Sequence, residues 1–231
     1  MALSRFLRAI FRLPLPRDDD EADRFVRRTF LLHFHPSRVK PEHLRLRHTW
    51  CMGGISALLF GVTVVSGIVL MFYYKPSVGE AHASVRDIES VVTLGPFWRA
   101  VHRYASELMI ITVFLHMVRV LLNRAYRPPR EFNWTVGFVM FLLLLFTAFT
   151  GYLLPFDVLS YNAVSVAKGM SDRVPFLGRA LAKLLFGGDY IGGEALLRFY
   201  VLHCVALPLS MAALMGLHFW RVRRDGYKGG L

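Results

Sequence analysis

A chain of 231 residues that is 55% hydrophobic, with a mean hydropathy of +0.41, is too apolar for a soluble domain of this length, so composition predicts several membrane spans. The formal net charge of +12 could indicate a nucleic-acid-binding protein. The basic residues gather instead at the ends of apolar stretches, without the interleaved polar residues that read bases, which excludes nucleic acid as a partner.

Residues 1–48 are predicted to form a cytoplasmic, amphipathic and basic segment ahead of a four-helix domain over residues 49–231. Apolar and basic residues alternate at helical spacing near the N-terminus, which favours a helix lying in the membrane interface. A signal peptide is not expected, because Arg5, Arg8 and Arg12 interrupt the apolar run and no small-residue cleavage site follows.

Hydropathy predicts four membrane-spanning helices. They cover about residues 50–74, 98–122, 134–154 and 199–220. One tryptophan stands at an end of each span, as in an aromatic belt: Trp50, Trp98, Trp134 and Trp220. The link from Pro155 to Leu197 contains apolar turns and is expected to form short surface helices.

The distribution of Lys and Arg predicts that both termini are cytoplasmic. The N-terminal segment, the second link and the C-terminal tail hold 18 of these residues, whereas the first and third links with their span edges hold 8. Because positive charge favours the cytoplasmic side, the second and fourth spans both run from outside to inside.

Each of these two spans carries two histidines: His102 and His116, then His203 and His218. The spacings of 14 and 15 residues return to within roughly 40° and 60° of one helix face, about 21–23 Å apart along the axis. Neutral imidazole is a common haem ligand. Paired by depth, His102 with His203 and His116 with His218, they predict an all-α, four-transmembrane-helix bundle enclosing two stacked bis-histidine b haems. The alternative, a hydrogen-bonded bundle histidine, suits one such residue better than four.

The first and third spans repeat the same step with glycines: Gly53 and Gly67, then Gly137 and Gly151. A glycine lets a bulky group approach the backbone, so these positions are expected to leave room for the two porphyrins. The alternative is close packing of helices in lipid through small residues. The shared 14-residue step favours clearance for haem.

Arginines lie within about a turn of the histidines: Arg99, Arg103, Arg119 and Arg198. Arginine pairs well with carboxylates such as haem propionates, while snorkelling to the headgroups is the alternative. Glu107 is a carboxylate in the middle of the second span, about 140° around the helix from His102. It is expected to make a polar contact to another subunit or to belong to a proton path.

Several segments are similar to those of a known family. They are W-C-M-G-G-I-S, F-Y-Y-K-P-S-V-G-E-A, V-H-R-Y, L-H-M-V-R-V, P-P-R-E-F-N-W, T-G-Y-L-L-P-F-D, L-R-F-Y-V-L-H and L-P-L. From Trp50 onward the chain resembles cytochrome b of the quinol-oxidising bc-type complexes, most closely the short, split form, cytochrome b6. The 14-and-15 histidine spacing is similar to the split form, whereas 14-and-14 is usual in mitochondrial relatives.

The resemblance implies roles for individual residues. His102 and His203 would ligate a low-potential haem near the outer face, and His116 and His218 a high-potential haem near the inner face. Arginines that match propionate partners are Arg99, Arg103 and Arg119. Cys51 matches the cysteine to which the split form attaches a third, c-type haem by one thioether, with Arg223 matching a basic residue nearby. Without the resemblance, a cysteine at the head of a span is a small buried hydrophobe.

The implied function is that of an enzyme subunit. It is the dihaem cytochrome b subunit of a quinol:cytochrome c (or plastocyanin) oxidoreductase, with quinol oxidised beside residues 152–170 and quinone reduced near the inner face. One rival is the dihaem membrane anchor of a dehydrogenase or hydrogenase, which would not explain the glycine repeats. The other is a non-redox transporter or assembly protein with metal-binding histidines.

The implied partners are those of a bc-type complex. They are a Rieske-type iron–sulphur protein, a separate subunit with the remaining cytochrome b helices, a c-type cytochrome, lipid and a second copy in a dimer. The segment L-P-F-D-V-L-S-Y-N departs from the usual family pattern, which has a tryptophan before the aspartate and a glutamine after it. This departure favours a bacterial cytoplasmic-membrane complex that uses menaquinone or another quinone.

Overall fold

The computed structural model describes residues 18, 20–21, 51–188 and 190–225. These residues form helices and connecting turns, with no strand among them, so the all-α prediction is confirmed. Most of the predicted N-terminal segment, and Trp50 with it, lies outside the described residues.

Four helices are long and apolar enough to cross a membrane, which confirms the predicted number of spans. They are α4 (Met52–Met71), α6 (Gly95–Leu122), α7 (Glu131–Leu153) and the continuous run of α10 (Gly193–Val201), η3 (Leu202–Ala206) and α11 (Leu207–Asp225). Helices α6 and α7 begin three residues earlier than predicted, and the last span begins at Gly193 instead of residue 199.

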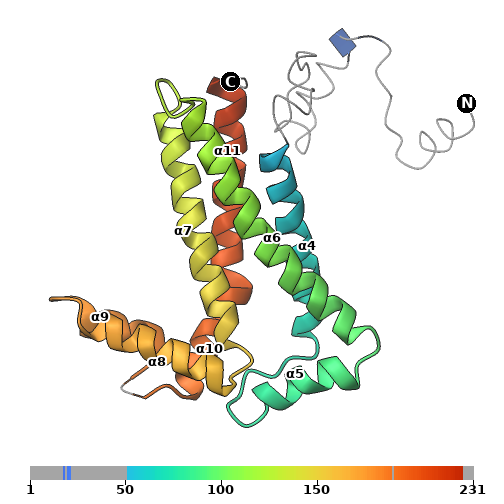
Figure 1. The fold of residues 1–231 in the computed structure, drawn as a ribbon, viewed down its shortest axis with the longest axis vertical. Helices are drawn as coiled ribbons and strands as arrows, with labels where there is room; N and C mark the ends of the chain where they lie inside the picture. The colour runs from blue at the N-terminus through green and yellow to red at the C-terminus, as the bar shows by residue number, and fades with distance from the viewer. Residues whose placement is uncertain (1–17, 19, 22–50, 189, 226–231) are drawn as a thin grey trace, which may run out of the picture.

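The spans form two pairs, in which α4 packs along α6 and α7 packs along α11 (Figure 1). The bundle has two ends that are useful as landmarks. The Cys51 end, at the top of Figure 1, holds the start of α4, the α6–α7 turn and the end of α11. The α5 end holds the remaining connections.

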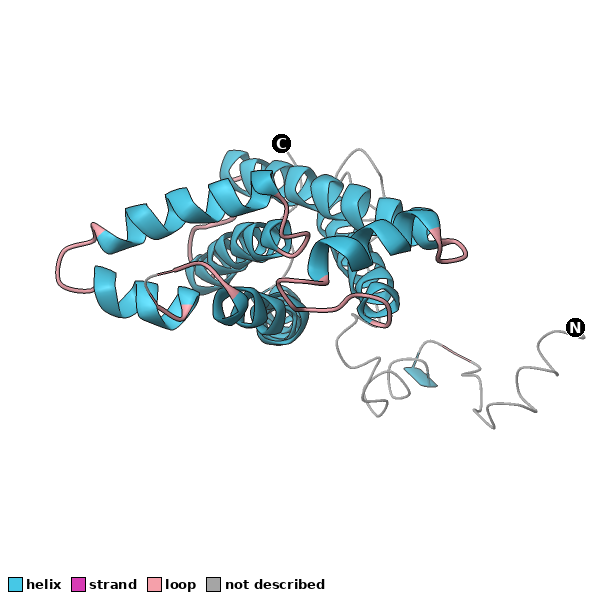
Figure 2. Ribbon diagram, turned by 90° about the horizontal axis from the view of Figure 1, so that it is seen from below, coloured by secondary structure: helices cyan, strands magenta, loops and turns pink. Residues whose placement is uncertain are grey.

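Two links at the α5 end contain helices. Helix α5 (Ala81–Ser90), which the sequence analysis missed, packs on α6, and its buried residues are Ala81, Ser84 and Ile88. The long third link forms α8 (Val158–Asp172) and α9 (Gly178–Phe186), as expected for short surface helices. The α8–α9 pair projects to one side of the bundle (Figures 1 and 2).

Buried apolar side chains gather at two levels. One cluster closes the α5 end and joins α8, α9 and α10 to α7: Ala81, Leu153, Val164, Ala182, Phe186, Ala195, Leu196 and Phe199. A smaller cluster of Met109, Leu144 and Met211 lies inside the bundle. Each member of the smaller cluster stands seven or eight residues from both histidines, or both glycines, of its own helix. This cluster therefore separates the two histidine levels.

Candidate functional site

At the α5 end, His102 of α6 faces His203 of η3. Their ring centroids are 6.1 Å apart and the ring planes meet at 73°. The Nδ1 atom of His102 lies 3.0 Å from the Thr63 carbonyl oxygen, and that of His203 lies 2.9 Å from the Thr147 carbonyl oxygen. A carbonyl oxygen only accepts, so Nδ1 carries the hydrogen in both rings and the Nε2 lone pair is left for a metal.

Buried hydroxyl groups support the same two rings. Ser66 Oγ lies 3.1 Å from His102 Nδ1, and Thr150 Oγ1 lies 3.4 Å from His203 Nδ1. Both hydroxyl residues are fully buried. Each imidazole at this end is thus oriented by a carbonyl and a hydroxyl of the neighbouring helix.

At the Cys51 end, His116 of α6 faces His218 of α11, with ring centroids 6.5 Å apart and an interplanar angle of 78°. A cavity of about 330 Å³ opens beside this pair. Its lining is largely apolar, and both histidines belong to it. The Nδ1 atom of His218 is buried near the Asn133 backbone, but it makes no hydrogen bond of acceptable geometry to the described residues.

The structure places each predicted glycine against one histidine ring of its paired helix. A Cβ atom added to Gly151 would lie 2.5 Å from His203 Cε1, and one added to Gly67 would lie 3.1 Å from His102 Cε1. At the other end, the corresponding distances are 3.3 Å from Gly53 to His116 and 3.6 Å from Gly137 to His218. The glycines therefore make room for the imidazole rings themselves, a closer role than the expected clearance for porphyrin.

A short sequence repeat explains why the α5-end rings are so well supported, and it was missed by the sequence analysis. The segments T-V-V-S-G (63–67) and T-A-F-T-G (147–151) share the pattern T-x-x-[ST]-G. In a helix, the residue four before the glycine points its carbonyl at the glycine's own N–H. With no side chain on the glycine, an imidazole can reach that carbonyl and the adjacent hydroxyl.

The five-residue π turn η3 accounts for the unequal histidine spacings. A π turn holds more residues than an α turn, so 15 residues from His203 to His218 cover about the same number of turns as 14 residues in α6. Pro208 follows at the start of α11, where its ring would press on the Cys204 carbonyl of a regular α-helix. The wider turn relieves this crowding and keeps His203 on the inner face.

The donor set fits a haem iron better than a free metal ion. Among residues 51–188 and 190–225, no group of three or more His, Cys, Asp or Glu side chains gathers. Each site instead offers two facing imidazoles, which fit the two histidines that would hold a bis-histidine haem. Two metal–imidazole bonds of about 2.0–2.1 Å, the length known for zinc, would put the ring centroids roughly 6 Å apart. The observed 6.1 and 6.5 Å match this separation.

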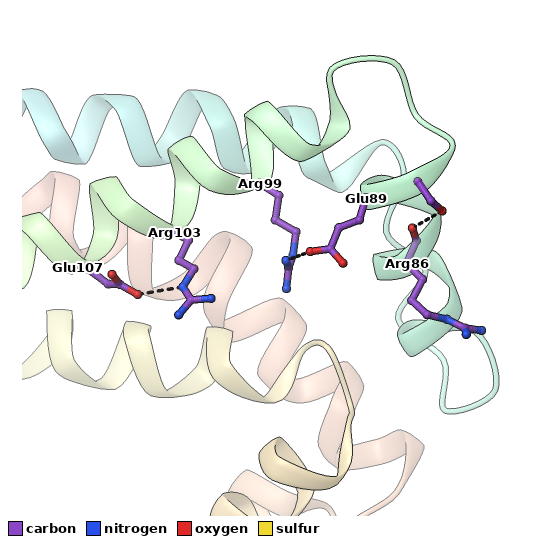
Figure 3. Close-up of polar contacts among 6 residues, drawn as sticks. Arg86, Glu89, Arg99, Arg103 and Glu107 are labelled. Carbon is purple, nitrogen blue, oxygen red and sulfur yellow. Dashed lines mark hydrogen bonds and ion pairs between the residues drawn. The ribbon is translucent and has the colours of Figure 1, made fainter.

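The predicted propionate partners Arg99 and Arg103 have carboxylate partners within this chain. Arg99 forms an ion pair with Glu89 of α5, and Arg103 Nε lies 3.0 Å from Glu107 Oε1 (Figure 3). The mid-span Glu107, expected to meet another subunit or a proton path, is bound to its own helix. The i, i+4 spacing of Arg103 and Glu107 is typical of an ion pair on a helix, and it could have predicted this contact from the sequence.

The remaining predicted site residues lie at the Cys51 end, with one exception. Cys51 is exposed, immediately precedes α4 with a φ of 48°, and lines the cavity together with Gly53 and Arg119. Arg223 lies in the last turns of α11, and its Nη1 atom is buried without a hydrogen-bond partner in the described residues. The exception is Arg198, which donates from Nη1 to the Lys183 and Leu184 carbonyls at the end of α9 and so holds the surface helices.

Comparisons with known proteins agree with this architecture. The family model described as cytochrome b/b6/petB matches residues 37–226. The chain is 37% identical over 195 residues to cytochrome b6 of Synechococcus elongatus, covering 84% of this chain and 90% of that protein. It is 39% identical over 195 residues to cytochrome b6 of Oltmannsiellopsis viridis, with the same coverage of both chains.

A solved structure shares the fold. A chain of a hyperthermophilic respiratory complex III superposes with a TM-score of 0.70 at 31% sequence identity, and the match covers 77% of this chain. It covers 48% of the solved chain, so the present chain spans about half the length of that protein.

Proposed function

Because the chain belongs to the cytochrome b/b6 family of multi-pass membrane proteins, which implies b-type haem, we propose that it is the dihaem cytochrome b subunit of a quinol:cytochrome c (or plastocyanin) oxidoreductase. In this role it carries electrons across the membrane. They enter from a quinol-oxidation site at the outer face and leave at a quinone-reduction site near the inner face.

The observation that carries this proposal is the pair of facing imidazoles at each of two levels. Each of these imidazole rings also lies against a glycine of α4 or α7. His102 with His203, and His116 with His218, would hold the iron of two b haems. Bound there, haem supplies one-electron redox chemistry at iron. The apolar layer of Met109, Leu144 and Met211 keeps water away from the space between the two levels.

The chain's own groups have distinct tasks in this arrangement. The Thr63 and Thr147 carbonyls hold their histidines in the tautomer whose Nε2 can bind iron. Arg99, Arg103 and Arg119 are suited to bind propionate carboxylates. The glycines keep the α4 and α7 backbones close to the rings.

The Cys51 end supports a third haem and a quinone-reduction site. Cys51 would hold the third haem through a single thioether bond. The cavity beside Cys51 and His116 offers space at that position, and the buried Nη1 of Arg223 offers a cationic donor in the same region. These features support a c-type haem next to the inner-face haem.

The Lys and Arg distribution supports an orientation with the Cys51 end and both termini in the cytoplasm. The segment L-P-F-D-V-L-S-Y-N, which departs from the usual family pattern, favours a bacterial host. Quinol would then be oxidised at the α5 end, beside the segment 152–170 that includes most of α8. Moving one electron to the Cys51 end shifts charge through the membrane potential, at roughly 2.3 kcal/mol per 100 mV.

Other subunits are needed to complete the enzyme. The chain covers about half of the complex III chain that it resembles. A subunit with the remaining cytochrome b helices is one of the partners we propose. A Rieske-type iron–sulphur protein would take one electron of each quinol, and a c-type cytochrome would accept it. A dimer in lipid, with menaquinone or another quinone as substrate, is the assembly we propose.

The test is a pyridine haemochrome spectrum of the purified protein beside a haem-stained denaturing gel. We expect two b haems per chain, and covalent haem stain on the 26.4 kDa band. Cys51→Ala should remove the stain and keep both b haems, while Cys204→Ala is the matched control that keeps the stain. Absence of b haem from the wild-type protein would refute the function, and stain that survives Cys51→Ala would refute the third-haem assignment.

A further inference from the structure

We propose that two glutamates of this chain, Glu89 and Glu107, lower the reduction potential of the haem at the α5 end. They act through Arg99 and Arg103, the arginines that would bind its propionates, and are positioning residues that do not ligate the iron. The inference rests on the proposed function, because it requires a haem between His102 and His203.

The two arginines of these ion pairs flank His102 along α6, on a side of the helix turned roughly 60–100° from it. Arg99 and Arg103 stand three residues before and one residue after His102, and both project from the same side of the helix (Figure 3). Arg99 Nη1 binds Glu89 Oε1, and Arg103 Nε lies 3.0 Å from Glu107 Oε1. Arg99 and Arg103, which are expected to bind propionates, are therefore already paired with carboxylates of the protein.

The arginines can still bind a second carboxylate. A guanidinium group has five N–H donors in a planar fork. Arg103 uses its Nε–H on Glu107, which leaves the Nη groups, the pair that suits a carboxylate best. A glutamate, an arginine and a propionate would then share one site, with a net negative charge where a lone arginine and propionate would be neutral.

Glu107 has a location that makes its charge effective. It lies near the midpoint of the 28-residue helix α6, five residues from His102 and nine from His116. The axial distances are about 7.5 Å and 13.5 Å, so the α5-end site is the nearer one. A charged group at the middle of a membrane helix is costly and is a functional candidate by default. Charges in this low-dielectric setting also interact more strongly than in water.

The sign of the effect follows from the charge on iron. Ferric haem carries one more positive charge than ferrous haem, so a nearby carboxylate stabilises the ferric form and lowers the reduction potential. Replacing either glutamate by glutamine removes the negative charge and keeps the shape. It should therefore raise the potential of the α5-end haem.

The experiment is an optical redox titration of the b haems in the purified complex, for the wild type, Glu89→Gln, Glu107→Gln and the double variant. We expect the midpoint potential of one haem to rise in each single variant and to rise further in the double variant. The other haem should move less. Glu80→Gln is the matched control, because Glu80 is also ion-paired, 2.8 Å from Lys75, but lies in the α4–α5 turn away from the spans.

The outcomes separate this inference from the proposed function. If the variants bind both haems and neither potential rises, or if Glu80→Gln raises it equally, the inference is overturned and the dihaem function stands. If the wild type binds no haem, the proposed function itself fails. Should Glu107→Gln not assemble, Glu89→Gln alone decides, since Glu89 lies on α5 outside the spans: an unchanged potential there overturns the proposal.

Discussion

The two histidine levels are built from the same kinds of residue, yet the α5-end level is held much more closely than the Cys51-end level. At the α5 end, the Nδ1 atoms lie 3.0 and 2.9 Å from backbone carbonyls and near buried hydroxyls. At the Cys51 end, His218 Nδ1 is buried without a hydrogen bond to the described residues, and a cavity of about 330 Å³ adjoins the rings.

The glycine contacts follow the same gradient. The space for an added Cβ atom is smallest at Gly151 and Gly67, where the nearest ring atom is 2.5 and 3.1 Å away, and larger at Gly53 and Gly137, at 3.3 and 3.6 Å. One level is thus preorganised around two imidazoles and accepts little change. The other has a cavity lined by both of its histidines, His116 and His218, and would accept small changes in the backbone around them more easily.

Gly151→Ala should produce the largest effect, because it adds a methyl group where the packing is closest. A Cβ atom 2.5 Å from His203 Cε1 forces the ring or the helix to move, and the hydrogen bond to the Thr147 carbonyl resists that movement. Overpacking of this kind costs about 1–3 kcal/mol. We expect the haem content to fall from two b haems per chain to one, measured by pyridine haemochrome against protein concentration.

Gly137→Ala is the matched control for this prediction, on the same helix and at the other level. Its Cβ atom would make an ordinary contact of 3.6 Å with His218, so both haems should remain. In a helix, alanine is more favourable than glycine by about 0.5–1 kcal/mol, and this applies equally to both variants. Loss of haem in Gly151→Ala alone would therefore not be an effect of helix propensity. Equal haem content in the two variants would contradict the difference between the levels.

Ser66→Ala should have an intermediate effect. It removes the hydroxyl 3.1 Å from His102 Nδ1 and leaves the Thr63 carbonyl in place. Loss of an outer-shell partner typically lowers metal affinity 10–100-fold, and one remaining bond suggests the lower end, about tenfold. The rate of haem transfer to an excess of an apo-haem acceptor protein measures this loss.

The control for Ser66→Ala is Ser56→Ala, which removes the hydroxyl of a different serine on the same helix. Ser56 Oγ donates to the Met52 carbonyl and lies 3.0 Å from Thr112 Oγ1, and it makes no hydrogen bond to a histidine of the described residues. Haem retention should be unchanged. A slower loss in Ser66→Ala than in Ser56→Ala would show that the hydroxyl does not support the ring.

The sequence predicts the frame of this molecule well, because the relevant signals are periodic. Apolar length gave four spans, and the 14- and 15-residue steps picked out the histidines and glycines that the structure places together. The roles of these residues as haem ligands stay predictions.

The features that distinguish the two histidine levels were harder to predict from the sequence. Helix α5 is only 10 residues long and strongly polar, so hydropathy passed over it, and with it the Glu89 partner of Arg99. The T-x-x-[ST]-G repeat was visible but carried no meaning until the rings were placed beside α4 and α7. The π turn was indicated only by a spacing of 15 residues and by Pro208.

Asp157→Ala should have the smallest effect. This variant tests whether the close packing of the α5 end depends on its surface helices. Asp157 caps α8: its Oδ1 accepts a 2.8 Å hydrogen bond from the Ser160 N–H, which lowers the pKa of this carboxyl. A folded-state pKa below the unfolded value stabilises the cap at neutral pH, and this stabilisation is lost as pH falls through the folded pKa. Removing the cap should cost α8 about 0.5–2 kcal/mol.

Hydrogen exchange of the first-turn amides of α8 measures this cost. The protection of these amides, relative to their intrinsic exchange rate at the same pH, should fall in Asp157→Ala, and in the wild type when the carboxylate is protonated at low pH. Asp157→Asn keeps an acceptor that does not titrate, so its exchange protection should not fall in the same pH range. Haem content should stay at two in every variant, because the α5-end rings are held by carbonyls of α4 and α7. If Asp157→Ala also released a haem, the surface helices, and not those carbonyls and the glycines beside them, would be what holds this level together.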